Sequence, residues 1–190
     1  LVPINDDSLL WVNAGVTPLK KYFDGSEVPE SRRLMSIQKC IRTNDIENVG
    51  VTKRHQTFFE MMGNFSVGDY FKNEAIGFAF ELLTSPEYFD ISKDLIYVTI
   101  YSNDDEAKKR WIEVGLDESH IVPLEGNFWE IGEGPCGPDS EIFFDRGEKY
   151  DPKGDALELF RKDEDQERYV EIWNNVFSQF NSKEGVPRSE

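Results

Sequence analysis

The chain has 190 residues, a formal net charge of −16 at neutral pH, 38% hydrophobic residues and 13% aromatic residues. This composition excludes a disordered or fibrous chain and is typical of one globular domain, or part of one, with a substantial core. No apolar run approaches the roughly 20 residues of a membrane-spanning helix, and no secretory signal is visible at Leu1. We therefore expect a cytoplasmic protein with no membrane partner, whose oligomeric state the sequence does not indicate.

Short runs of apolar, β-branched and aromatic residues predict six strands, at 9–12, 36–42, 53–61, 95–101, 141–145 and 169–180. The most regular helical pattern covers 69–84, with Asp69 as its N-cap. Residues 94–124 are predicted to form a strand–helix–strand unit, in which Asn103 and Glu106 have the spacing of a capping box. Together these elements indicate a chain that mixes strands and helices.

The central stretch of the chain combines cations with aromatic residues. Two strands folded over a polar loop would bring Arg42 close to Arg54 and His55, with Phe58 and Phe59 alongside. Cations beside an aromatic ring suit a nucleotide, because the charges bind the phosphates and the ring stacks on the base. Neighbouring residues of a strand point to opposite faces, so only one of the two phenylalanines can take that role.

Positive charge is concentrated in the same region, since residues 31–54 contain six cations and two acids. The rest of the chain is strongly acidic, which argues against a nucleic-acid duplex gripped along its length. A basic island on an acidic body is typical of a phosphate ligand held at one site. For Arg32 and Arg33, a solvated turn is the simpler interpretation.

Residues 132–138 are rich in glycine and proline and predict a rigid loop whose backbone lies close to whatever it covers. The loop leads into the strand at 141–145, where Glu141 and Asp145 share a face but are roughly 13 Å apart, too far to share one metal ion. Glu141 is the better candidate for a Mg²⁺ ligand, because it follows the loop. Asp145 is a candidate for a turn or cap residue.

The last part of the chain begins with an acidic, turn-rich segment, 150–168, which we expect at the surface. The segment that follows, RYVEIWNNVFSQFN, matches either one face of a helix or one face of a strand. Its valine, isoleucine and aromatic residues favour the strand.

The two cysteines, Cys40 and Cys136, occur without a CxxC pair or a histidine cluster. This pattern is typical of free thiols in a reducing compartment. We therefore expect both cysteines to be unpaired and the chain to contain no structural zinc.

Four phrases occur in order along the chain: NDIENVG, RHQTFFEMMGNFSVGDYF, GPCGPDSEIFFD and EIWNNVFSQFN. The first two, with Arg42 before them, resemble the second class-defining motif of class II aminoacyl-tRNA synthetases, in the form carried by alanyl-tRNA synthetases. The similarity runs from Leu1 to about Asn181. It implies the α+β catalytic fold of that class, an antiparallel sheet flanked by helices, in an incomplete form, with ATP, Mg²⁺ and alanine as ligands. The strands and helices predicted above agree with this fold.

The resemblance also implies a reaction, in which ATP activates alanine to alanyl-adenylate and the alanine then passes to the 3′ end of tRNA(Ala). Arg42 matches the arginine that bridges the α-phosphate and the amino-acid carboxylate. Arg54 and His55 match the position at the terminal phosphates. Phe59 matches the ring that stacks on adenine, and Glu60 could hydrogen-bond the edge of the base.

The alanine pocket implied by the resemblance is walled by Val16, Trp129 and Val176, with Asn174 beside them. For Val16 and Trp129, packing in the core is an equally good interpretation. A pocket of this kind excludes larger side chains, but it distinguishes alanine from glycine by only about 1–3 kcal/mol. Such a family therefore needs an editing site, and the HxxxH pattern of an editing domain does not occur in these 190 residues.

The third class-defining motif, a glycine-rich strand–helix turn ending in Glu-Arg, is also missing from the 190 residues. We therefore expect 1–190 to be a fragment of a catalytic domain that is inactive alone, within which 94–124 resembles an elaboration of the family fold. Two alternatives stay open. One is a class II-like carboxylate–amine ligase that works without tRNA, and the other is a non-catalytic interaction domain whose basic island binds an acidic partner.

Overall fold

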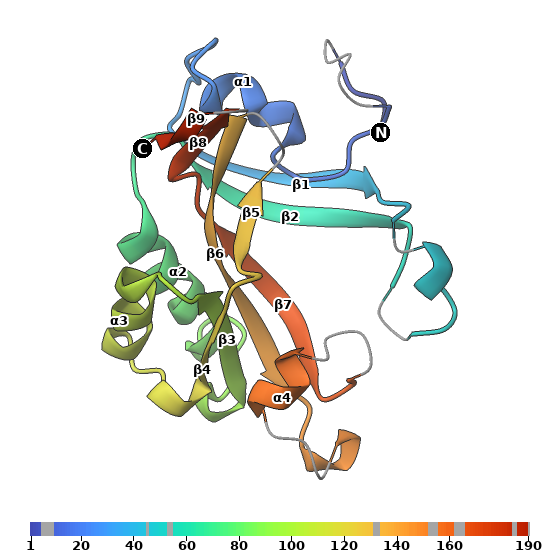
Figure 1. The fold of residues 1–190 in the computed structure, drawn as a ribbon, viewed down its shortest axis with the longest axis vertical. Helices are drawn as coiled ribbons and strands as arrows, with labels where there is room; N and C mark the ends of the chain where they lie inside the picture. The colour runs from blue at the N-terminus through green and yellow to red at the C-terminus, as the bar shows by residue number, and fades with distance from the viewer. Residues whose placement is uncertain are drawn as a thin grey trace. The chain divides into compact units, whose positions relative to one another are not determined.

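The computed structural model describes residues 1–4, 10–44, 46–52, 55–130, 134–151, 156–161, 166–183 and 186–189. The chain divides into two compact units, Leu1–Tyr70 and Phe71–Glu190. Figure 1 shows their helices and strands. Over the described ranges, no helix combines the length and the apolar character that crossing a membrane requires.

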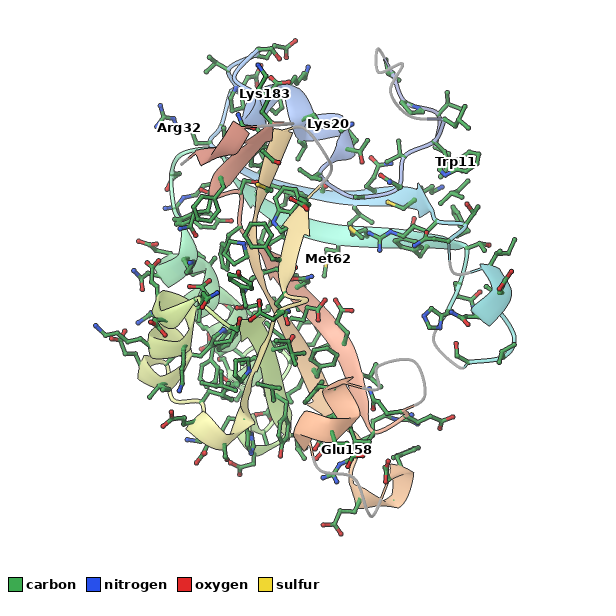
Figure 2. All side chains as sticks on the ribbon, viewed as in Figure 1. Trp11, Lys20, Arg32, Met62, Glu158 and Lys183 are labelled. Atoms are coloured by element: carbon green, nitrogen blue, oxygen red, sulfur yellow. The ribbon has the colours of Figure 1, made fainter. Side chains whose placement is uncertain are left out.

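The first unit is built on an antiparallel pair of strands. Its elements are η1 (Thr17–Leu19), α1 (Lys20–Phe23), β1 (Arg33–Ile41), η2 (Ile46–Asn48) and β2 (Phe58–Ser66). Side chains of the pair alternate between a covered face, which carries Phe59, and an exposed face, which carries Phe58. On the covered face, Phe23 of α1 meets Phe65 edge-on at 6.5 Å between ring centroids. Met62, labelled in Figure 2, projects from the exposed face.

The predicted hairpin is confirmed, with its strands displaced along the chain. β1 begins before the predicted limit and β2 ends after it, because the paired register continues through Arg33 and Ser66. Lys53 and Arg54 lie outside the described residues. The strand predicted at 9–12 is wrong for the described positions 10–12, which form no strand.

The second unit contains a sheet of seven strands with helices on both faces. Its helices are α2 (Lys72–Thr84), η3 (Lys93–Leu95), α3 (Asp105–Glu113), η4 (Glu118–His120), η5 (Glu148–Tyr150) and α4 (Ala156–Arg161). Its strands are β3 (Ile96–Tyr101), β4 (Ile121–Leu124), β5 (Phe128–Glu130), β6 (Gly134–Asp145), β7 (Tyr169–Val176), β8 (Phe180–Lys183) and β9 (Val186–Ser189). The pairs are antiparallel except β3 with β4.

β6 is the centre of this sheet (Figure 1). Its carboxyl-terminal half pairs with β3 on one edge and β7 on the other, and its amino-terminal half pairs with β5 and β8. Ile142 belongs to the core cluster formed with α2 and α3, whereas Phe143 packs with α4 on the opposite face. The predicted α+β fold, an antiparallel sheet flanked by helices, is confirmed.

The helix predicted at 69–84 begins at Lys72, and Asp69 is not its N-cap. The Asp69 carboxylate instead accepts hydrogen bonds from the guanidinium of Arg33, at 2.9 Å from Nη2. The residue at the N-cap position of α2 is Phe71.

The N-cap of α3 is also displaced by one residue, and Ala107 at the third helical position cannot complete the predicted capping box. Asp104, not Asn103, is the N-cap, and its Oδ1 accepts a hydrogen bond from the N–H of Ala107 at 3.0 Å. The strand–helix–strand order predicted for this part of the chain is present as β3, α3 and β4.

Two segments predicted as loop or surface belong to the sheet and the core. Residues 134–138 continue β6 rather than forming a loop, because their backbone pairs with β5 and β8; Gly132 lies outside the described residues. In the predicted surface excursion at 150–168, α4 buries Leu159 and Phe160 against β6.

The strand predicted at 169–180 is two strands, β7 and β8, separated by a short turn. The register of β7 shifts opposite Ile142 and Phe143, so that Ile172 is an extra residue. As a result, the consecutive residues Ile172 and Trp173 both pack against the core cluster. This bulge interrupts the two-residue period and explains why the sequence matches a helix and a strand about equally.

An ion pair closes the end of β6. Asp145 accepts two hydrogen bonds from Arg168, both at 2.8 Å, and one from the N–H of Gly147. Burial raises the pKa of the Asp145 carboxyl, but these hydrogen bonds outweigh burial and hold that pKa below its ordinary value. The carboxylate therefore contributes stability that is complete above the unfolded-state pKa of about 4 and is lost as the pH falls through the lower, folded-state pKa.

We expect Asp145→Asn to lower the free energy of unfolding at neutral pH by about 3 kcal/mol, because it leaves the Arg168 guanidinium without its counter-charge. The difference from wild type should shrink below about pH 4, where the wild-type carboxylate also loses its charge. Urea unfolding at several pH values measures both effects. Asp105→Asn, at an exposed position of α3, is the control, and a pH-independent deficit in Asp145→Asn would contradict the expectation.

Candidate active-site residues

Arg42 lies directly after β1. Its backbone N–H donates to the carbonyl of Thr57 at 3.0 Å, and its Nε donates to the carbonyl of Asn13, also at 3.0 Å. The guanidinium carbon lies 5.3 Å from the centroid of the Phe59 ring, a distance typical of a cation–π contact. The first unit therefore brings together the cation and the aromatic ring that the sequence predicts for a nucleotide.

The turn after Val12 packs beside this pair. The N–H of Ile41 donates to the carbonyl of Val12 at 2.9 Å, and the N–H of Gly15 lies 3.1 Å from the sulfur of Met61. The turn thus lies on the covered face of β1 and β2. Val16 follows it and is 39% exposed, so core packing does not account for this residue.

The remaining residues expected at the nucleotide are Glu60, His55 and Arg54. Glu60 follows Phe59 in β2 and therefore projects to the opposite, exposed face of the strand pair. His55 precedes β2, and its Nδ1 lies 2.6 Å from the hydroxyl of Thr52. Arg54 lies outside the described residues.

In the second unit, one face of the sheet carries the residues expected at alanine and at Mg²⁺. Paired residues of neighbouring strands project their side chains to the same face. The pairs on this face are Glu141 with Asn174, Asp139 with Val176, and Gly137 with Trp129. Because these positions of β6 are two residues apart, every predicted site residue of this unit shares one face.

Two of these residues are accessible. Val176 is 53% exposed and Trp129 is half-buried, so neither is an ordinary core residue. The indole N–H of Trp129 donates to the carbonyl of Phe177 at 3.0 Å, which orients the ring.

A buried polar cluster on the same face was not predicted. Nδ2 of Asn127 donates to Asp139 at 2.8 Å and to the hydroxyl of Thr99 at 2.9 Å, and that hydroxyl donates to Glu141 at 3.2 Å. Burial raises the pKa of the Asp139 carboxyl, although Asn127 and Asn174 both donate to it. The available signal was the spacing of Asp139 and Glu141, two residues apart, which places both on one face once 134–138 is recognised as strand.

This cluster orients Glu141 but is not a complete metal site. In the part of the chain that the structure describes, no three His, Cys, Asp or Glu side chains are grouped to hold a metal ion. Mg²⁺ bound with substrate phosphates commonly takes only one or two carboxylates from the protein. A single carboxylate such as Glu141 fits that mode of binding.

Comparison with known proteins identifies the family. The model of the family described as tRNA synthetases class II (A) matches residues 1–189. Over all 190 residues the chain is 64% identical to the alanine–tRNA ligase of Acholeplasma laidlawii, and 62% identical to those of Streptococcus pyogenes serotype M18 and Lactococcus lactis subsp. cremoris. The chain belongs to the class II (A) tRNA synthetase family, and the resemblance drawn from its motifs is confirmed. It spans 22% of the length of each of these relatives.

At Gly137, the turn after β7 lies close to the backbone of β6. A Cβ atom at this position would lie 2.2 Å from the carbonyl oxygen of Phe177 and 3.0 Å from the nitrogen of Gln179. We expect Gly137→Ala to lower the free energy of unfolding by about 1–3 kcal/mol through overpacking. Gly126→Ala is the control, because a Cβ atom there meets open space. Equal thermal unfolding of the two variants would show that the close approach has no energetic consequence.

Proposed function

We propose that this chain supplies the ATP- and alanine-binding part of the aminoacylation domain of an alanine–tRNA ligase. The observation that carries the proposal is the guanidinium of Arg42 lying over the ring of Phe59 at the end of β1. The high identity to several alanine–tRNA ligases over the whole chain supports it.

In the proposed first step, Arg42 binds both the carboxylate of alanine and the α-phosphate of ATP. A carboxylate oxygen attacks the α-phosphorus, the bond to the bridging oxygen breaks, and pyrophosphate leaves. The step requires alignment and charge neutralisation rather than a covalent intermediate. A planar guanidinium suits this role because it can bind two anions at once. The hydrogen bond from its Nε to Asn13 orients the group and leaves the terminal nitrogens for the anions.

In this proposal Phe59 stacks on adenine. When ATP binds, the adenine base takes the place of the Arg42 guanidinium over the ring. Arg54 and His55 contact the terminal phosphates. Glu141 contributes a carboxylate to the Mg²⁺ that accompanies ATP, and its bond from Thr99 holds it in place. When bound, Mg²⁺ would supply positive charge that offsets the negative charge of the phosphates.

On the second unit, Asn174, Trp129 and Val176 bind alanine in this proposal, and the motif resemblance alone assigns Val16 to the alanine pocket. The polar network around Asp139 restrains this part of the sheet face, because Asn127 donates to both Asp139 and Thr99. Transfer of alanine to the 3′ end of tRNA(Ala), in the cytoplasm, is the proposed activity of the whole protein. The 190 residues lack the third class-defining motif, so we expect no complete reaction from the chain alone.

The test is alanine-dependent ATP–pyrophosphate exchange by the whole protein. Arg42→Ala should lower kcat/KM by about 10²–10³-fold, the loss expected when a preorganised group that stabilises transition-state charge is removed. Lys39→Ala is the matched control, because this exposed cation lies in β1, three residues before Arg42, and projects to the face opposite Phe59. Exchange that is unchanged in Arg42→Ala, or lowered equally in both variants, would overturn the proposal.

A further inference from the structure

Lys72, the first residue of α2, is a buried cation. Its Nζ lies 2.8 Å from Oδ1 of Asp104, and the two side chains are only 3% and 4% exposed. Glu106, which is half exposed, adds a second carboxylate at 3.4 Å. A buried ion pair contributes little net stability, because desolvation offsets the attraction between the charges. Its presence therefore calls for another explanation.

The same ammonium group contacts the turn between β7 and β8. Nζ donates to Oε1 of Gln179 at 3.3 Å and lies 5.5 Å from the centroid of the Phe177 ring. The ring of Phe71 meets Phe177 edge-on at 5.5 Å. Three contacts thus join the start of α2 to this turn.

The turn between β7 and β8 also contacts Trp129. Its backbone is bonded to β6, since the N–H of Phe177 donates to the carbonyl of Pro138 and that of Gln179 to the carbonyl of Cys136, both at 3.1 Å. The carbonyl of Phe177 is the acceptor for the indole N–H of Trp129 at 3.0 Å. A displacement of the turn therefore displaces the hydrogen-bond acceptor of Trp129.

We propose that Lys72 is a positioning residue for the alanine pocket, which acts through Gln179 and Phe177 on Trp129 without touching the substrate. The proposal rests on the proposed function in one respect, the assignment of Trp129 to the pocket wall. Asp104 neutralises the cation and anchors it to the start of α3, so that the ammonium can hold the turn in one place. A buried polar contact of this kind selects a single geometry rather than adding stability.

The first measurement is the solvent exchange rate of indole N–H groups by NMR, in the 190-residue chain. Trp111 provides an internal reference, because its indole donates to Ser140 in the same unit but on the side of α3. Gln179→Leu removes the acceptor of Lys72 and keeps the ion pair. We expect this variant to accelerate exchange at Trp129 about fivefold, the equivalent of one lost hydrogen bond, and to leave Trp111 unchanged.

A second variant, Lys72→Met combined with Asp104→Asn, removes the ion pair without leaving a buried charge alone. It should accelerate exchange at Trp129 by at least as much as Gln179→Leu. Glu106→Gln is the matched control, because it removes the half-exposed carboxylate near Lys72 and keeps the buried ion pair with Asp104. It should change the exchange rate of neither indole. Unchanged exchange at Trp129 in Gln179→Leu, or equal acceleration at both indoles, would overturn the positioning role.

The second measurement is ATP–pyrophosphate exchange by the whole protein carrying Gln179→Leu. The KM for alanine should rise about fivefold while the KM for ATP stays the same, a separation that general destabilisation would not produce. A rise in the exchange rate of the Trp129 indole without any change in the KM for alanine would overturn the assignment of Trp129 to the pocket while leaving the link from Lys72 to Trp129 intact. The two failures are therefore distinguishable.

Discussion

The fold of the second unit depends on the close packing of other strands and helices around β6. The strand pairs along both edges, and apolar clusters cover both of its faces toward the carboxyl end. At Gly137 the turn after β7 comes so close that no Cβ atom fits. A strand in this position needs glycine where another backbone passes and apolar residues where helices pack. The sequence GPCGPDSEIFFD meets both needs within one element.

At residues 139–141, the two faces of β6 have different roles, one in core packing and the other in a polar network. On one face, Ser140 accepts the indole N–H of Trp111 within the layer formed by α2 and α3. On the other, Asp139 and Glu141 lie in a network of buried hydrogen bonds. Buried polar groups require partners, so the network determines the side-chain positions before a ligand arrives. In the first unit, the hydrogen bond from Nε of Arg42 to the carbonyl of Asn13 has the same effect.

Much of the candidate site follows from local patterns. A hairpin predicts that Arg42 lies near Phe58 and Phe59, and the two-residue period allows only one of these rings on its face. The motif resemblance selected Phe59. The hydrogen bonds of Asp69 could not be predicted, because its partner Arg33 lies 36 residues earlier in the chain. The ion pair with Arg33 outweighs the weak preference of aspartate for a helix N-cap. The glycines and prolines that suggest a loop are strand residues for a similar reason, since β5 and β8 supply their pairing.

By itself, the sequence determined the order of the main strands and helices, the α+β class and the family, because hydrophobic period and motif spacing are properties of neighbouring residues. Only the tertiary structure decided that Ile172 forms a bulge and that Lys72 is buried beside Asp104. Each of these depends on strand register or on a partner from a distant segment. Such pairings are selected by burial and by hydrogen bonding in the folded chain, which no local pattern records.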